Sequence, residues 1–238
     1  MNIQAIILIG GLGTRLAALF PDRPKALVPV GSRVFLDRQL DWLARCGVAG
    51  AHLAAGHGAG RLQTWLAGWR PPMPVTISVE PAPLGTGGGL QFAAARMQTD
   101  PFLVLNGDSL LPGLDLRGML DAHGQAAAAV TMAVVPVTDA GRYGLVEIDD
   151  AQRVRAFREK AAATAGWVNG GVYLAGRELL AALPPAPPPV SLERDVFPGL
   201  AAAGRIRAWT TPAPLLDMGT PEGLQRMADY FLSADYAD

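Results

Sequence analysis

An apolar run near the N-terminus, interrupted only by Gln4, leads directly into a glycine-rich turn. The run is Ile3–Ile9, and the turn is Gly10-Gly11-Leu12-Gly13-Thr14-Arg15-Leu16. A short apolar run that stops at glycines is typical of a buried strand followed by a tight turn. The sequence therefore predicts a chain built around a buried N-terminal strand.

The turn after this strand has the chemistry of an anion site. Glycines let the backbone approach a ligand closely and let successive N–H groups point at one anion. Arg15 within the turn and Lys25 after Pro24 add positive charge. We expect Gly10, Gly11, Leu12, Gly13 and Thr14 to hold a nucleoside triphosphate. On the glycines alone, a plain strand–helix turn stays open.

Two common nucleotide motifs are excluded here. A dinucleotide fingerprint needs a third glycine where this chain has Leu16, and a Walker P-loop needs Gly-Lys-Ser/Thr, which does not follow. Leu16 therefore also disfavours a Rossmann oxidoreductase.

The first half alternates strand-like and helix-like segments. The predicted strands are 3–9, 48–55, 75–79, 102–105 and 127–137, and the predicted helices are 35–46, 60–69, 87–97 and 116–123. Such alternation favours a mostly parallel α/β sheet covered by helices on both faces. Ligands bind beyond the carboxyl ends of such strands, so the loops there are expected to converge on one cleft.

The second half has shorter strand-like pieces. We expect strands at 144–148, 154–158, 167–174 and 205–210, and helices at 177–183, 191–200 and 221–232. Asp149-Asp150 favours a hairpin turn, and Ser191 is a predicted N-cap. We predict one domain over 1–238, with a nucleotide-binding core at 1–137 and a small lobe with a C-terminal helix at 138–238.

Two further loops carry candidate ligands. Glu80 precedes Leu84, Gly85, Thr86 and a run of glycines. Because such a glycine-rich loop costs conformational entropy, close approach of a ligand is favoured over a flexible connector. Gly107-Asp108 and Asp217 each end a strand-like step, and two carboxylates over a triphosphate suit Mg²⁺. A lone Asp in such a loop is also a common turn residue.

Charge and cysteine content limit the partners. The 238 residues carry a net charge of −1, with 17% charged residues and one cysteine. We therefore expect no nucleic-acid partner, no membrane partner and no disulfide framework, and we expect a cytoplasmic protein. A homo-oligomer stays open.

Taken together, the motifs resemble the sugar-1-phosphate nucleotidyltransferases, also called NDP-sugar pyrophosphorylases. The resemblance rests on Gly10–Leu16, Pro24-Lys25, Glu80–Gly88, Gly107-Asp108, Tyr143-Gly144, Glu159-Lys160, Asn169-Gly170-Gly171 and Asp217–Pro221. It implies a Rossmann-like fold, and transfer from an NTP to a sugar 1-phosphate that releases pyrophosphate.

The resemblance also implies site roles. Catalytic roles fall to Arg15, Lys25, Asp108 and Lys160, and Mg²⁺ to Asp108 and Asp217. The nucleotide is implied to contact the first turn together with Glu80, Leu84, Gly85, Thr86 and Gly107. The sugar phosphate is implied to contact Tyr143, Gly144, Glu159, Lys160, Asn169, Gly170 and Tyr173.

Within the family, the chain is most similar to the D-glycero-α-D-manno-heptose 1-phosphate guanylyltransferases, which implies GTP. Mannose 1-phosphate guanylyltransferase and N-acetylmuramate 1-phosphate uridylyltransferase stay open. A catalytically inactive regulatory relative is disfavoured because Arg15, Lys25, Asp108 and Asp217 are all present. We expect no left-handed β-helix domain. Ala161 stands where the family often has proline, which weakens the placement of Lys160.

Overall fold

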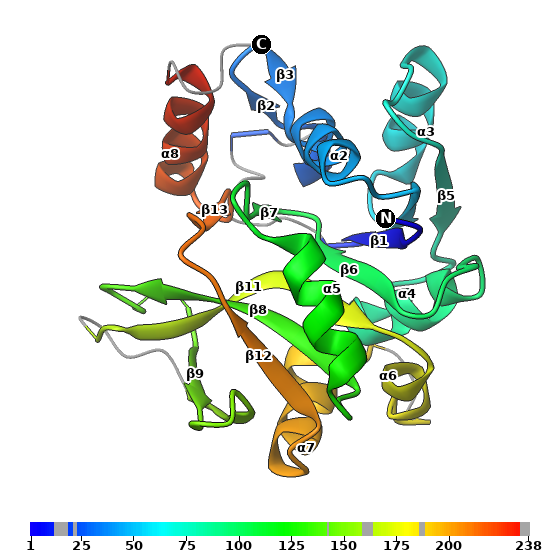
Figure 1. Cartoon of the computed structure of the whole chain (residues 1–238). Coiled ribbons are helices and arrows are strands. Elements are labelled where there is room, and N and C mark those ends of the chain that lie inside the picture. The colour runs from blue at the N-terminus through cyan, green and yellow to red at the C-terminus, as the bar shows by residue number, and fades with distance from the viewer. Residues whose placement is uncertain (12–18, 21–22, 142, 159–163, 186–188, 234–238) are drawn as a thin grey trace.

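The computed structural model describes residues 1–11, 19–20, 23–141, 143–158, 164–185 and 189–233. Its centre is a nine-stranded sheet (Figure 1). The strands of this sheet are β1 (Gln4–Ile9), β4 (Gly50–Ala55), β5 (Val75–Val79), β6 (Phe102–Asn106), β8 (Val130–Val137), β9 (Leu145–Ile148), β10 (Val154–Arg158), β11 (Gly166–Ala175) and β12 (Ile206–Thr210). The predicted strands are all present, with ends that shift by a few residues.

One half of the sheet is parallel. Strands β5, β4, β1 and β6 lie side by side in that order, and Ile7 of β1 is opposite Leu53 on one side and Leu105 on the other. The carboxyl ends of these strands therefore meet at one edge of the sheet. This confirms the strand–helix interpretation of the first half of the chain.

The other half is largely antiparallel, which limits the prediction of a mostly parallel sheet to the first half. Strand β11 runs antiparallel to β6, β8 and β9, and β12 is parallel to β8. The β9–β10 hairpin turns at Asp149, whose Oδ1 accepts the N–H groups of Ala151 and Arg153. Short connections such as this hairpin produce antiparallel neighbours.

Helices cover both faces of the sheet. They are α2 (Phe35–Arg45), α3 (Ala59–Gly68), α4 (Gly85–Ala94), α5 (Leu116–Gln125), α6 (Arg177–Ala181), α7 (Phe197–Ala202) and α8 (Pro221–Leu232). Figure 1 shows α2, α3 and α8 on one side and α6 and α7 on the other. Strand β1 supplies both cores, because Ile7 packs into one buried cluster and Ile6 into the other.

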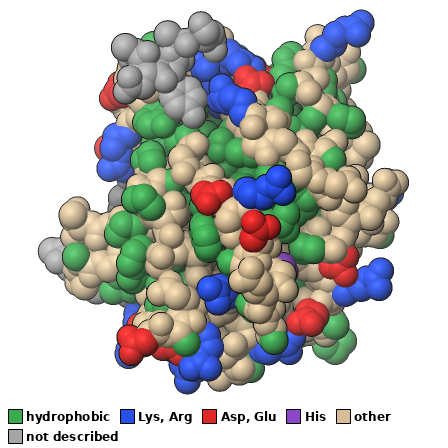
Figure 2. All heavy atoms as spheres, in the orientation of Figure 1, with side chains coloured by type: hydrophobic (Ala, Val, Ile, Leu, Met, Phe, Trp, Pro, Cys, Tyr) green, Lys and Arg blue, Asp and Glu red, His purple; other side chains and the backbone are tan. Residues whose placement is uncertain are grey.

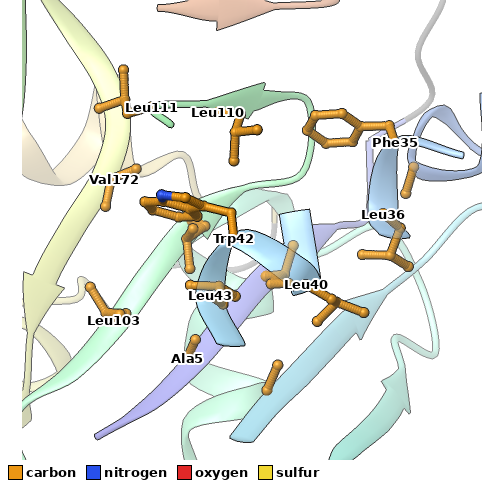
Figure 3. Close-up of a cluster of buried hydrophobic side chains, with 14 of the residues drawn as sticks. Ala5, Phe35, Leu36, Leu40, Trp42, Leu43, Leu103, Leu110, Leu111 and Val172 are labelled. Carbon is orange, nitrogen blue, oxygen red and sulfur yellow. The ribbon is translucent and has the colours of Figure 1, made fainter. Parts of the chain in front are cut away.

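Helix α2 packs an apolar face against the sheet. Figure 3 shows Leu43 of this helix beside Ala5 of β1, and Trp42 beside Val172 of β11. All of these side chains are buried. The apolar residues recur at helical spacing, so one face of the helix can pack on the sheet. The packed helix fixes the position of the loops at its end of the sheet.

The segment predicted as one helix over 191–200 is divided in the structure. A π-helical turn, η2 (Leu192–Val196), precedes α7. Pro198 has no N–H, so the α-helical hydrogen bond to the residue four positions earlier cannot form. The predicted N-cap is confirmed, since the Ser191 hydroxyl accepts the N–H of Arg194. π-Turns often mark functional sites.

Three small elements lie outside the main sheet. They are the 3-10 helix η1 (Lys25–Leu27), the β2–β3 hairpin (Pro29–Val30 and Arg33–Val34) and the β7–β13 pair (Ser109–Leu110 and Leu216–Asp217). Acidic and basic side chains are interspersed over the face in Figure 2. None of the helices in the described ranges combines the length and apolarity that a membrane crossing requires.

Candidate active site

A cavity of about 370 Å³ opens beyond the carboxyl ends of β1 and β6. Three of the loops predicted to converge do so here. The wall includes Gly10 and Gly11 after β1, Glu80, Gly85 and Thr86 after β5, and Gly107 and Asp108 after β6, together with Lys25. These predicted residues are far apart in sequence, and the parallel half of the sheet brings them to one place.

Lys25 and Asp108 form an ion pair at the cavity. Lys25 Nζ donates to Asp108 Oδ2 at 2.9 Å, and both side chains are partly exposed, at 21% and 34%. Lys25 begins the 3-10 helix η1, and Pro24 before it has an extended backbone. The Lys25 ammonium therefore orients the Asp108 carboxylate and is still accessible to an anion in the cavity.

Asp217 is brought next to Asp108 by the short β7–β13 pair. Asp217 is opposite Ser109 in the register, and the N–H of Met218 donates to the carbonyl of Asp108 at 3.0 Å. The Asp217 Oδ1 atom accepts the N–H of Gly219 at 2.6 Å. Two carboxylates therefore lie on adjacent backbone segments at the same edge of the sheet. This donor set fits a hard cation such as Mg²⁺, which takes one or two carboxylates together with phosphate oxygens.

The loop that carries Asp108 follows β6 and packs closely against the backbone of β1. The N–H of Gly107 donates to the carbonyl of Leu8 at 3.0 Å, and a Cβ at Gly107 would lie 2.4 Å from that oxygen. Only glycine fits this contact. The sequence predicted Gly107 as a nucleotide contact, and the structure adds that it fixes the position of Asp108.

Glu80 lines the same cavity beside Gly10. Its Oε2 accepts the N–H of Leu84 at 3.1 Å, and Oε1 lies where a Cβ on Gly10 or Gly89 would come within 3.0 Å. Burial raises the pKa of the Glu80 carboxyl, and the bond from Leu84 opposes this rise. The glycines around Glu80 thus make room for its carboxylate.

The glycine-rich loop packs against the protein itself more than the sequence indicated. Gly85 has a φ of +76°, and a Cβ there would lie 2.4 Å from the carbonyl oxygen of Val190. The N–H of Gly87 donates to this same oxygen at 2.8 Å, and the N–H of Val190 donates to the carbonyl of Leu84. These glycines therefore join the loop to the segment before η2. Gly85 still reaches the cavity, but close approach of a ligand is not the only reason for the glycines.

The predicted sugar residues on β11 differ in their access. Asn169 is half-buried, whereas Tyr173 and Gly170 are buried. Asn169 Nδ2 donates to the Tyr173 hydroxyl at 2.7 Å, and Asn169 Oδ1 accepts the N–H of Gly171 at 2.9 Å. The Tyr173 ring packs in the core, 5.2 Å from the Phe197 ring, and its hydroxyl orients Asn169. Contact of Tyr173 with a sugar stays a prediction.

Other predicted sugar contacts lie beyond this cavity or outside the described residues. Tyr143 is half-buried, and Gly144 is exposed and packs close to the carbonyl of Arg158 at the end of β10. Arg158 directly precedes Glu159 and Lys160 in the sequence. Those two residues, together with Leu12, Gly13, Thr14 and Arg15, lie outside the described residues.

Sequence reasoning missed several residues at the site. Asn106, Pro189 and Glu193 line the cavity. Gln39 of α2 is fully buried and donates to the carbonyls of Asn106 and Ser109, at 3.0 and 3.1 Å, on both sides of Asp108. A signal for Gln39 was available, because a glutamine among the apolar positions of a helix needs a buried partner. For Glu193, the helical pattern gave no indication that its segment reaches the cavity.

Comparisons with known proteins show the family of the chain. The family model described as "Nucleotidyl transferase" matches residues 4–225. The chain is 34% identical over 229 residues to a mannose-1-phosphate guanylyltransferase of Mycobacterium tuberculosis, a match covering 94% of this chain and 63% of that protein. It is 30% identical over 224 residues to a D-glycero-alpha-D-manno-heptose 1-phosphate guanylyltransferase of Aneurinibacillus thermoaerophilus, covering 94% and 96%.

A solved structure is similar over almost the whole chain. HddC from Yersinia pseudotuberculosis superposes with a TM-score of 0.86 at 29% identity, covering 96% of this chain and 99% of that chain. The same protein complexed with GMP-PN gives a TM-score of 0.85. Together with the family match over residues 4–225, this likeness supports the fold described above. The chain belongs to the nucleotidyl transferase family.

Proposed function

We propose that this protein transfers a guanylyl group from GTP to a sugar 1-phosphate, giving a GDP-sugar and pyrophosphate. The observation that carries the proposal is the arrangement in one cavity of Lys25, Asp108 and Glu80. Asp217 lies on the backbone next to Asp108. Lys25 suits a triphosphate, the carboxylate pair suits its metal ion, and the half-buried acceptor Glu80 suits its base.

The reaction asks little of a general base. The nucleophile is a phosphate oxygen of the sugar 1-phosphate, which is largely ionised near pH 7 because its second pKa is about 6. It attacks the α-phosphorus of GTP, and the bond from that phosphorus to the pyrophosphate oxygen breaks. The difficulty is to bring two anions together in line. Lys25, and Arg15 and Lys160 by resemblance, offset this repulsion.

Asp108 and Asp217 are the residues that would hold Mg²⁺. The ion would supply charge neutralisation at the phosphates when it is bound. Lys25 occupies one oxygen of Asp108, and within the described ranges no side chain donates to the second oxygen, which could serve as a ligand. The Gly219 N–H fixes the direction of the Asp217 carboxylate. These contacts orient both carboxylates before any substrate arrives.

Glu80 is the proposed acceptor for guanine. Guanine carries two N–H donors on its Watson–Crick edge, and an ionised carboxylate accepts both. The Leu84 bond holds one oxygen of Glu80 in place within the cavity wall. The guanylyltransferase relatives and the GMP-PN complex of HddC support this choice of base.

For the sugar, we propose D-glycero-α-D-manno-heptose 1-phosphate, with mannose 1-phosphate as the second candidate. The heptose enzyme is similar to this chain over almost its whole length, whereas the chain spans 63% of the mannose enzyme, which is the more identical of the two. Both sugars share the manno ring. We also propose that the protein acts in the cytoplasm and that it can form a homo-oligomer.

The proposed function is tested by pyrophosphate release. Purified protein with Mg²⁺ is offered GTP, UTP, CTP, ATP or dTTP against heptose, mannose and N-acetylmuramate 1-phosphates. We expect release with GTP and a manno-configured sugar phosphate. Release with UTP and N-acetylmuramate 1-phosphate alone would assign the uridylyltransferase alternative, and no release with any pair would refute the enzyme.

Replacing Glu80 by Gln tests the assignment of the base. The amide has the size of the carboxylate but loses its charge, and hydrogen bonds to charged groups are among the stronger ones. We expect the ratio of kcat/KM for GTP over UTP to fall about 10- to 100-fold. Glu178→Gln is the control, because Glu178 is 62% exposed, pairs with Arg205 and is not among the residues that line the cavity. An unchanged GTP preference in Glu80→Gln would exclude the role of Glu80.

A further inference from the structure

Glu193 is a third carboxylate at the cavity, after Glu80, proposed for the base, and Asp108, proposed for the metal ion. It lies in the π-turn η2, which follows the segment that packs on the glycine-rich loop. Its side chain lines the same cavity as Lys25 and Asp108. A carboxylate repels phosphate oxygens at short range, so a site for phosphates alone would not place one here. Glu193 is therefore expected to face a neutral, hydroxyl-bearing part of the substrates.

The Glu193 carboxylate is held in one orientation by two hydroxyl groups. Thr86 Oγ1 donates to Glu193 Oε2 at 2.8 Å, and Ser191 Oγ donates to the same oxygen at 3.0 Å. The Thr86 hydroxyl in turn accepts the N–H of Leu192 at 2.8 Å. Both donors go to Oε2, so in the described part of the chain Oε1 accepts no hydrogen bond. An oriented acceptor with one unused oxygen is suited to a ligand that donates.

The position of Glu193 indicates which ligand this is. Glu80 lines the cavity beside Gly10 and Gly89, where we place the base. Glu193 instead lies in η2, which leads directly into α7, where the Phe197 ring packs 5.2 Å from the Tyr173 ring. The Tyr173 hydroxyl accepts a hydrogen bond from Asn169. Glu193 thus lies toward the Asn169 side, where the resemblance places the sugar.

We propose that Glu193 is a specificity-determining residue that accepts a hydrogen bond from a hydroxyl group of the sugar. Thr86 acts as a positioning residue, because its hydroxyl orients the Glu193 carboxylate. This inference rests on the proposed function for the identity of the donor as a sugar. It also reassigns the side chain of Thr86 from the nucleotide to the sugar side of the cavity.

The test compares the binding of GDP-mannose with that of GDP by calorimetry. The two ligands differ by the mannosyl group and by the extra ionisation of the terminal phosphate of GDP, so the change in their affinity ratio between variant and wild type reports the sugar contacts. We expect Glu193→Gln to weaken GDP-mannose binding about 10- to 100-fold relative to wild type, and to change GDP binding less than about twofold. Thr86→Val should also weaken GDP-mannose binding relative to GDP binding, but by a smaller factor. Thr86→Ser keeps the hydroxyl and should leave the ratio of the two affinities at the wild-type value.

Asp195→Asn is the structural control. Asp195 belongs to the same π-turn and accepts the Ser191 N–H at 2.7 Å, but it is exposed. An equal loss of GDP-mannose binding in Asp195→Asn would show that only the order of the turn matters, and would overturn the proposal. Equal weakening of GDP and GDP-mannose by Glu193→Gln, or no effect on either, would also overturn it. Because binding is measured without turnover, failure of the proposed reaction would appear separately, as absent pyrophosphate release.

Discussion

Replacing Asp108 by Asn is expected to reduce kcat at least about 1,000-fold, with little change in stability. A bound metal ion contributes several kcal/mol to charge stabilisation in the transition state, and each 1.4 kcal/mol corresponds to about a tenfold change in rate. The amide keeps the shape of the carboxylate but binds a hard cation poorly. Steady-state pyrophosphate release measures the effect.

Stability after this change is expected to stay close to wild type. The Lys25–Asp108 pair is partly exposed, and such pairs contribute about 0–1 kcal/mol to folding. The melting temperature should therefore shift by less than about 4 °C. Asp100→Asn is the matched control, because Asp100 pairs with Arg177 at 3.3 Å on an exposed surface. Near-normal turnover in Asp108→Asn would show that Asp108 is a turn residue only.

Replacing Lys25 by Met is expected to lower kcat/KM for GTP about 100- to 1,000-fold. Removal of one preorganised group that stabilises developing charge has an effect of this size in other enzymes. The change removes the ammonium near the phosphates and also releases Asp108 Oδ2 from its 2.9 Å contact. Lys25→Arg should recover only part of the activity, since a planar guanidinium does not reproduce the point charge of an ammonium.

A matched change separates local charge from net charge. Arg177→Met removes one positive charge at a side chain that is 89% exposed and paired with Asp100. We expect its kcat/KM to stay within about twofold of wild type, because exposed charges beyond a Debye length are screened. An equal loss in Arg177→Met and Lys25→Met would show that net charge, and not the position of Lys25, causes the effect.

The parallel half of the fold could be predicted from the sequence because its signals are local. The apolar runs at Ile3–Ile9 and Phe102–Leu105 are short and end at glycine or Asn-Gly, and the structure confirms both strands. Their carboxyl ends must meet in a parallel sheet. The meeting of Gly10, Glu80 and Asp108 at one cavity follows from that rule.

The antiparallel pairings could not be predicted with the same reliability. Strand β11 contacts β6, β8 and β9, and its register shifts between Asn169 and Tyr173. Such a shift depends on tertiary contacts, since a Cβ at Gly171 would lie 2.4 Å from Ser109 Oγ. The burial of Tyr173 follows from this packing. Residue spacing alone carries no information about it.

Polar residues on helices were the other omission. Gln39 and Glu193 lie on helical segments, where their roles depend on what the helix faces. Gln39 contacts the two carbonyls around Asp108, and Glu193 contacts Thr86, which is distant in sequence. Both contacts are set by how helices dock on the sheet, which helical periodicity does not specify.

We expect this cavity to join a sugar phosphate directly to the α-phosphorus of GTP. The most direct test uses heptose 1-phosphate with ¹⁸O in the non-bridging oxygens of its phosphate, followed by mass spectrometry of the products. Attack by one of these oxygens predicts that the GDP-sugar retains all of the label and that the pyrophosphate contains none. Label in pyrophosphate or inorganic phosphate, or no labelled GDP-sugar at all, would contradict the account.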